Sequence, residues 1–200
     1  TRVERTHFTK KSERKLARAN KALHRKINGS KNREKAKLRV AKVHAYTANC
    51  RKHFLHNETA KIVRSYRVVG LETLNLKALA KTKLAKGFSD VSLGEFKRQL
   101  IYKAKQAGSY ILEVSQWFPS TKMCSTCGLN SKKQPLGIRE WNCSGCNTIH
   151  DRDLNAAMNL EKVAREYWET VNACGETVRP GLVTIPASFS EAGIKIDESL

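Results

Sequence analysis

The chain has 200 residues, of which 40% are hydrophobic, so it is long enough for one medium domain or two small ones with a buried core. It carries 38 Lys and Arg against 18 Asp and Glu, and it lacks the run of about 18 apolar residues that a membrane-spanning helix needs. No apolar stretch follows its first residues, which argues against a signal peptide, and we expect a cytoplasmic protein that binds no membrane. It does not begin with methionine, so we expect a fragment of a longer protein.

The positive charge is concentrated in the first third of the chain. Residues 1–66 hold 20 Lys and Arg and 4 Glu, a net charge of +16, whereas residues 67–200 have a net charge of only +4. A polyanion such as DNA or RNA fits this pattern, because each phosphate that a cation neutralises releases a counterion. The alternative is a pair of basic helices that is merely well solvated.

Two helices are predicted within residues 1–66. The first spans residues 9–27, and residues 28–30, with Gly29 at their centre, break it. The second runs from about residue 31 to 65, with an apolar seam at spacings of four and three residues that requires one partner. The region is therefore predicted to be a basic helical hairpin. Its candidate contacts to nucleic acid are Lys10, Lys11, Arg14, Arg18, Arg25, Lys31, Arg33 and Lys35.

Residues 67–120 change to an α/β pattern. Residues 67–71 form a short β-branched apolar run, which predicts a buried strand with Glu72 at its C-terminal end. Residues 77–89 are rich in Lys, Ala and Gly and are expected to be a loop. A helix that stops at Gly108 and a strand over residues 110–117 follow.

Four of the six cysteines form two Cys-x-x-Cys pairs within residues 121–150. These are Cys124, Cys127, Cys143 and Cys146, with 15 residues between the pairs. Two thiolates on each tight turn can complete a tetrahedron around zinc, and four thiolates leave no open position, so the zinc would be structural. Two redox pairs are the alternative, and His150 could be a ligand in principle, although we expect it on the surface or in a loop.

Three carboxylates stand at places where strands and helices begin or end. Glu72 closes the first strand, and Asp151 and Asp153 lie at the start of the segment 151–172, in which a final helix is predicted from near Asp153 to about Val171. Residues 173–200 are expected to be an irregular tail. Acids of this kind can converge and hold the metals of phosphodiester hydrolysis. Composition alone favours simpler roles, an N-cap for Asp153 and a solvated charge for Glu72.

Several segments together resemble the C-terminal half of the TnpB (OrfB) proteins. These transposon-associated proteins of bacterial insertion sequences are similar to type V CRISPR nucleases. The resemblance spans roughly residues 8 to 181 and is specific in the combination and order of its motifs. The segments that carry it are residues 29–33 (GSKNR), 70–75 (GLETLN), 124–128 (CSTCG), 151–160 (DRDLNAAMNL) and 174–180 (CGETVRP).

The resemblance implies a fold and an activity. It implies the α/β class, namely a partial RuvC-like RNase H fold with the basic hairpin and an inserted four-cysteine zinc ribbon. The family activity is RNA-guided cleavage of DNA, with Mg²⁺ at three carboxylates. Glu72 would be the second carboxylate and Asp153 the third, since Asp153 lies two residues before Asn155, as the family acid does, and Asp151 is the alternative. The zinc ribbon and the hairpin would contact DNA and a guide RNA.

One departure from the family bears on activity. The first carboxylate of the family is an Asp on a strand upstream of the basic helices, whereas this sequence has no Asp before Asp90. A missing first strand should leave a sheet edge exposed. We therefore expect a truncated nucleic-acid-binding protein that does not cut DNA alone. The alternative is an active Mg-dependent endonuclease that a missing N-terminal segment completes, and a third hypothesis is a zinc scaffold that binds protein.

Overall fold

The computed structural model describes residues 8–74, 81, 92–131, 135, 137–175 and 178–185, without the side chains of Thr9 and Lys11. The chain divides into two compact units. Unit 1 comprises Thr1–Ile62 and Asn75–Gln99, and unit 2 comprises Val63–Leu74 and Leu100–Leu200. None of the described helices is both long and apolar enough to cross a bilayer.

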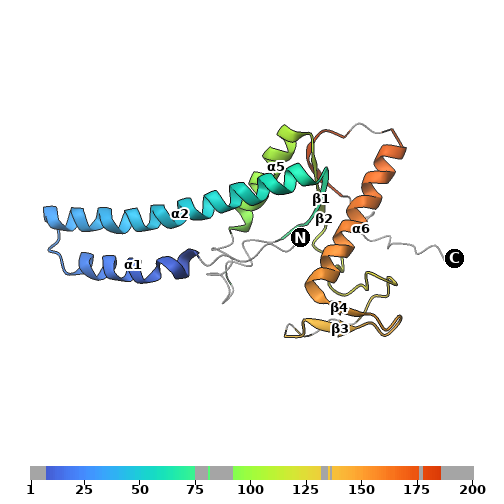
Figure 1. The fold of residues 1–200 in the computed structure, drawn as a ribbon, viewed down its shortest axis with the longest axis horizontal. Coiled ribbons are helices and arrows are strands. Elements are labelled where there is room, and N and C mark those ends of the chain that lie inside the picture. The colour runs from blue at the N-terminus through green and yellow to red at the C-terminus, as the bar shows by residue number, and fades with distance from the viewer. Residues whose placement is uncertain are drawn as a thin grey trace. The chain divides into compact units, whose positions relative to one another are not determined.

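The first two helices form the expected hairpin. Helix α1 (Phe8–His24) and helix α2 (Lys31–Ser65) lie side by side and run in opposite directions within unit 1 (Figure 1). Thr47 donates a hydrogen bond of 2.9 Å to the Ser12 hydroxyl oxygen, and the rings of Phe8 and Phe54 meet edge to face with centroids 5.8 Å apart. The contacts thus occur along the apolar seam that the sequence pattern predicts for α2.

Helix α1 ends three residues earlier than the predicted residue 27. Arg33 explains the early end, because its Nη1 donates to the carbonyl oxygens of Leu23 at 3.3 Å and Lys26 at 3.1 Å. The last carbonyls of a helix have no partner within the helix, and a guanidinium can satisfy them. Ile27, the last residue of the predicted helix, is 82% exposed beyond this cap.

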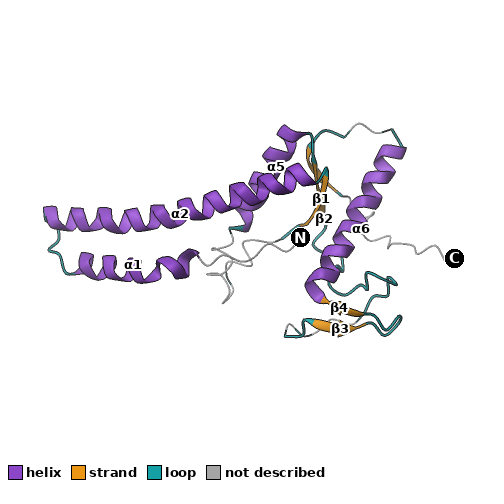
Figure 2. Cartoon of the chain, viewed as in Figure 1, coloured by secondary structure: helices purple, strands orange, loops and turns teal. Residues whose placement is uncertain are grey.

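Unit 2 contains a parallel three-stranded sheet (Figure 2). Its strands are β1 (Val68–Glu72), β2 (Tyr110–Val114) and β5 (Gly181–Thr184), in the order β1-β2-β5. Val68 pairs with Tyr110 at one end, and Glu72 pairs with Val114 at the other. All five residues of β2 are buried, as expected for a central parallel strand, whereas those of β1 are half-buried. The outer edge of β1 pairs with no strand in the described part of the chain.

Helix α6 (Arg152–Ala173) packs on this sheet and runs opposite to its strands. Trp168, late in α6, stacks on Tyr110 at the start of β2, with ring centroids 4.2 Å apart. Nearer the start of α6, Leu160 and Ala164 lie against Gly70 in the middle of β1, where an added Cβ would lie 3.0 Å from the Leu160 carbonyl oxygen. The N-terminus of α6 is therefore directed toward the edge at which β1 and β2 end.

Two sequence predictions in this region were wrong. Strand β2 ends at Val114 rather than residue 117, because the Phe118 amide donates to the Ser115 carbonyl in a turn that leaves Trp117 77% exposed. The tail is not irregular throughout, since β5 pairs with β2 from Gly181 to Thr184. The predicted loop over residues 77–89 lies, except for Lys81, outside the described residues.

The remaining elements frame the cysteines and lead into the strands. Helix α5 (Leu93–Ala107) precedes β2, and the Ser109 amide donates to the Ala104 carbonyl after its end. Strands β3 (Glu140–Asn142) and β4 (Ile149–Asp151) form a short antiparallel ribbon that ends where α6 begins. The chain is thus of the α/β class with a small parallel sheet, as predicted.

Candidate metal centre and carboxylate edge

Two similar turns carry the four cysteines. In the first, the Gly128 amide donates to the Cys124 carbonyl at 2.9 Å, and in the second the Asn147 amide donates to the Cys143 carbonyl at 2.9 Å. Gly128 and Asn147 occupy the same place in their turns, and both have positive φ values, 74° and 55°. Glycine and asparagine tolerate this backbone region best, so the sequence builds the same turn twice.

The four sulfur atoms converge on one point. All four Sγ atoms lie within 4.8 Å of one another. The distance from Cys124 to Cys146 and that from Cys127 to Cys143 are both 3.6 Å. A tetrahedral zinc site with Zn–S bonds of about 2.3 Å requires sulfur–sulfur distances of about 3.8 Å. The cluster therefore fits a metal ion of this size and ligand preference.

Hydrogen bonds within the turns favour thiolates at the second cysteine pair. The hydroxyl and amide of Thr148 lower the pKa of Cys146 to about 6. The amides of Cys146 and Gly145 lower the pKa of Cys143. At Cys127 the Leu129 amide acts in the same direction, but burial and the neighbouring sulfurs outweigh it and raise the pKa to about 12. Four adjacent thiolates repel one another, so full ionisation of the cluster needs a cation.

His150 is neither exposed nor in a loop, contrary to the sequence expectation. It lies in β4, is 7% exposed, and pairs with Trp141 of β3. Its ring lies against the Trp141 ring with centroids 4.9 Å apart, and its Nε2 is 3.0 Å from Cys124 Sγ. The imidazole therefore contacts a sulfur of the cluster from outside the set of four.

Two buried asparagines join the first cysteine turn to α6. Asn155 and Asn159 are each 1% exposed, and the Nδ2 atom of each donates to the Met123 carbonyl at 2.7 Å. Asn155 Oδ1 also accepts the amide of Ser125 at 2.9 Å. Because Met123 and Ser125 flank Cys124, these bonds hold the first cysteine turn against the first turns of α6.

Glu72 is placed at the C-terminal end of β1, as predicted. Its side chain is partly buried, and this desolvation raises the pKa of its carboxyl group. Among the described residues no ion pair or hydrogen bond to this carboxylate is found. The Glu72 carboxylate is therefore partly desolvated, whereas composition alone favoured a solvated charge.

The helix cap is Asp151, not Asp153. Asp151 Oδ1 accepts the amides of Asp153 at 2.9 Å and Leu154 at 3.0 Å, the geometry of an N-cap. The Asp153 side chain is 72% exposed, and its Oδ1 lies 3.8 Å from Arg152 Nε. The interpretation of Asp153 as the N-cap is thus wrong, and its carboxylate is the more available of the two.

Glu72 and the first turn of α6 lie at the same edge of the sheet. The segment that follows β2 at this edge supplies the Ser120 and Met123 carbonyls, which bond Asn159 of α6. However, the cysteine cluster is the only group of three or more candidate ligands within 4.8 Å of one another that the described residues form. The carboxylates thus share an edge without forming a complete metal site.

The predicted basic contacts differ in their accessibility. Lys10, Arg14 and Arg18 are spaced by four residues on α1, so they share one helix face. Arg33 is half-buried in the cap of α1, and the side chain of Lys11 is outside the described set. The exposed members are Lys10, Arg14, Arg18, Arg25, Lys31 and Lys35.

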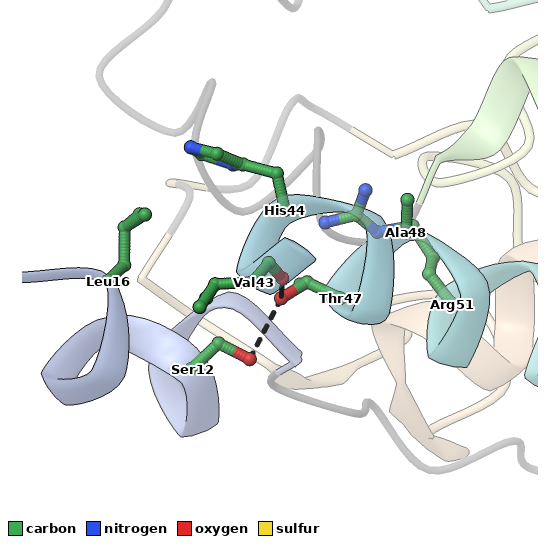
Figure 3. A pocket seen from close by; sticks show the side chains of 7 residues that line it. All are labelled: Ser12, Leu16, Val43, His44, Thr47, Ala48 and Arg51. Carbon is green, nitrogen blue, oxygen red and sulfur yellow. Dashed lines mark hydrogen bonds between the residues drawn. The ribbon is translucent and has the colours of Figure 1, made fainter. Parts of the chain in front are cut away.

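A groove of about 290 Å³ lies between α1 and α2 (Figure 3). The Thr47 hydroxyl oxygen in this groove lies within hydrogen-bonding distance of both the Ser12 hydroxyl oxygen and the Val43 carbonyl oxygen, each at 2.9 Å. These polar groups bond one another rather than converging on open space, so the groove reflects packing of the two helices. Its lining residues are Ser12, Leu16, Val43, His44, Thr47, Ala48 and Arg51.

Comparison with known proteins assigns these features to one family. The OrfB_IS605 family, described as "Probable transposase", matches residues 1–83, and the "Cas12f1-like, TNB domain" family matches residues 94–160. A protein of Streptomyces pristinaespiralis, described provisionally as an RNA-guided DNA endonuclease, is 40% identical over 167 residues, which cover 83% of this chain and 40% of the relative. The chain belongs to the TnpB/OrfB family.

Other relatives of this TnpB/OrfB chain include different kinds of protein. A TnpB-like protein of Acanthamoeba polyphaga mimivirus is 27% identical over 169 residues, covering 80% of this chain and 32% of the relative. A CRISPR-associated DNA-binding protein of Pelobacter propionicus, Cas12m, is 29% identical over 122 residues, covering 55% of this chain and 18% of the relative. The chain spans less than half the length of each of these relatives.

Three residues of this TnpB/OrfB chain have contacts that sequence reasoning did not assign. His150 contacts a sulfur of the cysteine cluster, and Asn155 and Asn159 donate hydrogen bonds to the first cysteine turn. The two asparagines are four residues apart, which places both on one face of the helix and could have indicated a shared contact. The only signal for His150 was its position three residues before Asp153, which does not distinguish a buried ring from a loop residue.

Proposed function

We propose that this chain is a nucleic-acid-binding part of a TnpB-type, RNA-guided DNA endonuclease. In this proposal the sheet of unit 2 belongs to a RuvC-like domain, and Glu72 and Asp153 are two of its metal-binding carboxylates. The four cysteines hold structural zinc, and the basic hairpin contacts the backbones of DNA and guide RNA. The proposed domains are residues 1–66, 67–120, 121–150, 151–172 and 173–200.

The observation that carries the proposal is the environment of Glu72. A partly buried carboxylate without a described cationic partner, and with a raised pKa, has a desolvation cost that a bound cation would offset. It stands at the C-terminal end of a parallel strand, toward which the N-terminus of α6 is directed. In open α/β sheets this edge is where ligands bind.

Asp153 suits the role of its partner better than Asp151. Asp151 uses its carboxylate to cap α6, whereas the Asp153 carboxylate is largely exposed at the same helix end. Mg²⁺ held by such carboxylates would activate water and stabilise the leaving oxygen in phosphodiester hydrolysis. Within this chain, Glu72 and Asp153 would hold the ion, and the cap would fix the backbone that carries Asp153.

The proposed zinc site has its own test. The sulfur distances support a tetrahedral ion with no open ligand position, hence a structural role. Metal analysis of the native protein should give about one zinc per chain, and chelation should lower the melting temperature, because metal binding is coupled to folding. Less than about half an equivalent of zinc per chain would contradict the site.

The 200-residue chain on its own is proposed to bind without cutting. Residues 1–89 contain no aspartate, so the first acid that the family resemblance implies is absent from this stretch. The outer edge of β1 is where a strand that carries such an acid would pair, because no described strand occupies it. The second candidate function is an active Mg-dependent endonuclease, in which a further segment supplies that strand.

The deciding experiment uses the chain with Mg²⁺, a guide RNA and plasmid DNA. Retarded migration of the nucleic acid without strand breaks is the expected result. Cleavage that is lost on the Glu72→Ala substitution would contradict the proposed inactivity of this chain and favour the second function. Neither retardation nor cleavage at low salt would contradict both candidate functions.

A further inference from the structure

Packing alone does not explain the position of the His150 side chain. A buried histidine in a short β-ribbon could simply pack against Trp141, and the ring contact at 4.9 Å meets that need. Packing alone would not bring Nε2 to 3.0 Å from Cys124 Sγ, a distance short for a hydrogen bond to sulfur. The ring is thus held by an aromatic neighbour on one side and directed at one sulfur of the cluster.

The chemistry of the sulfur determines the direction of this bond. A metal-bound cysteine is a thiolate, which has no proton to donate. In such a bond Nε2 must therefore carry the hydrogen, so His150 is the donor and the Cys124 thiolate is the acceptor. Cys124 is also the most secluded position of the first pair, since it is 1% exposed.

The same residue is tied to the beginning of α6. His150 immediately precedes Asp151, whose carboxylate caps the helix. Ser125, the residue after Cys124, donates its amide to Asn155 of that helix. A bond from His150 to Cys124 therefore closes a loop of contacts that joins the metal ligand, the helix cap and the first turns of α6.

We infer that His150 is a positioning residue of the metal centre, which donates a hydrogen bond from Nε2 to the Cys124 thiolate and thereby raises the affinity of the cluster for zinc. It is not a fifth ligand, because the four sulfurs, which all lie within 4.8 Å of one another, already supply the four ligands of a tetrahedral zinc site. This inference rests on the proposed zinc site. Groups that hydrogen-bond to metal ligands typically change metal affinity by about 10- to 100-fold when they are removed.

Two substitutions separate the hydrogen bond from the packing. His150→Phe keeps a ring against Trp141 but removes the donor, whereas His150→Gln keeps an N–H donor and removes the ring. Thr148→Val is the matched control at another sulfur, because the Thr148 hydroxyl lies 3.2 Å from Cys146 Sγ. Cys174 is exposed and serves as the internal reference for thiol reactivity.

The test measures metal affinity and the reactivity of individual cysteines in the full 200-residue chain. Zinc affinity is measured by competition with a chromophoric chelator, and alkylation rates relative to Cys174 are read by peptide mass spectrometry. We expect His150→Phe to weaken zinc binding by about 10-fold or more and to speed alkylation chiefly at Cys124. His150→Gln should retain most of the affinity, and Thr148→Val should act chiefly at Cys146.

The outcomes separate the inference from the zinc site on which it rests. Unsubstituted protein without bound metal would contradict both. If the unsubstituted protein contains zinc, and the Phe and Gln variants have the same zinc affinity and the same Cys124 reactivity as the unsubstituted protein, the inference alone would be contradicted. Equal losses in both variants would also contradict it, because that result assigns His150 a packing role.

Discussion

At the scale of single residues, Glu72 has a titration that can be tested. Burial raises the pKa of its carboxyl group, so the cost of burying the charge is absent below the ordinary pKa of about 4.3 and grows as the pH rises through the raised native value. Without divalent ions, Glu72→Gln should therefore stabilise the chain at pH 7.5 and should do so less at pH 5. Melting temperatures of both proteins at the two pH values check this.

Magnesium provides the control for this prediction. If Glu72 binds the ion, Mg²⁺ should raise the melting temperature of the unsubstituted protein and have a smaller effect on the Gln variant. The opposite result would be a Glu72→Gln variant whose melting temperature, relative to that of the unsubstituted protein, is lower at pH 7.5 than at pH 5. That result would contradict the prediction and show that Glu72 has a stabilising partner.

The sequence predicted the cysteine cluster better than the acids. The spacing of the four cysteines specifies two identical turns, and metal geometry leaves little choice in how they meet. Asp151 and Asp153 could not be separated by local pattern, because either acid is a good N-cap and the choice depends on where the first helical turn starts. The contact of His150 with the cysteine cluster depends on how β4 lies against the first cysteine turn, which no local sequence pattern predicts.

At the scale of elements, the packing of α6 on β1 depends on Gly70. A Cβ at this position would lie 3.0 Å from both the Ala164 Cβ and the Leu160 carbonyl oxygen, and neither can move without shifting α6. Gly70→Ala should lower the free energy of unfolding by about 1–3 kcal/mol, as overpacked cores do. Denaturant unfolding of the zinc-saturated protein measures this change.

Gly137 provides the matched control for Gly70. An added Cβ there meets no atom within 4 Å. Gly137→Ala should therefore leave the unfolding free energy within about 0.5 kcal/mol of the unsubstituted value. Equal effects of the two substitutions would contradict the close approach of β1 and α6.

The long helix α2 was predictable with its bounds, whereas the short strand β5 was not. Helix α2 has the predicted bounds, residues 31–65, because its apolar seam repeats over many turns. Strand β5 has four residues, and its pairing with β2 is set by long-range contact rather than by a pattern within residues 181–184. The end of α1 was missed because the cap comes from Arg33, nine residues beyond His24.

At the scale of the whole molecule, the charge of the hairpin predicts a steep salt dependence of nucleic-acid binding. Lys10, Arg14 and Arg18 share one exposed face of α1 and form no ion pair with any described residue. If each contacts a phosphate, replacing all three by Ala should reduce the slope of log affinity against log salt by about 3. Fluorescence anisotropy with labelled duplex at several salt concentrations measures the slope.

A second triple substitution controls for net charge. Lys37, Lys61 and Arg165 each pair with a glutamate on their own helix, so their charges are already compensated. Replacing these three by Ala should change the salt slope much less. Binding that stays unchanged between low and high salt would contradict the proposed electrostatic contact.

If Glu72 and Asp153 are carboxylates of a nuclease centre, a protein completed at its N-terminal side should cut DNA by means of both. The part of the Streptomyces relative that precedes the matched region would be fused before Thr1 and assayed with guide RNA, plasmid and Mg²⁺. Glu72→Gln and Asp153→Asn should each abolish this cleavage. Asp151→Asn should largely preserve it, because asparagine also caps a helix. Cleavage that survives Asp153→Asn but is lost with Asp151→Asn, or that does not depend on Glu72, would contradict the proposed roles of Glu72 and Asp153.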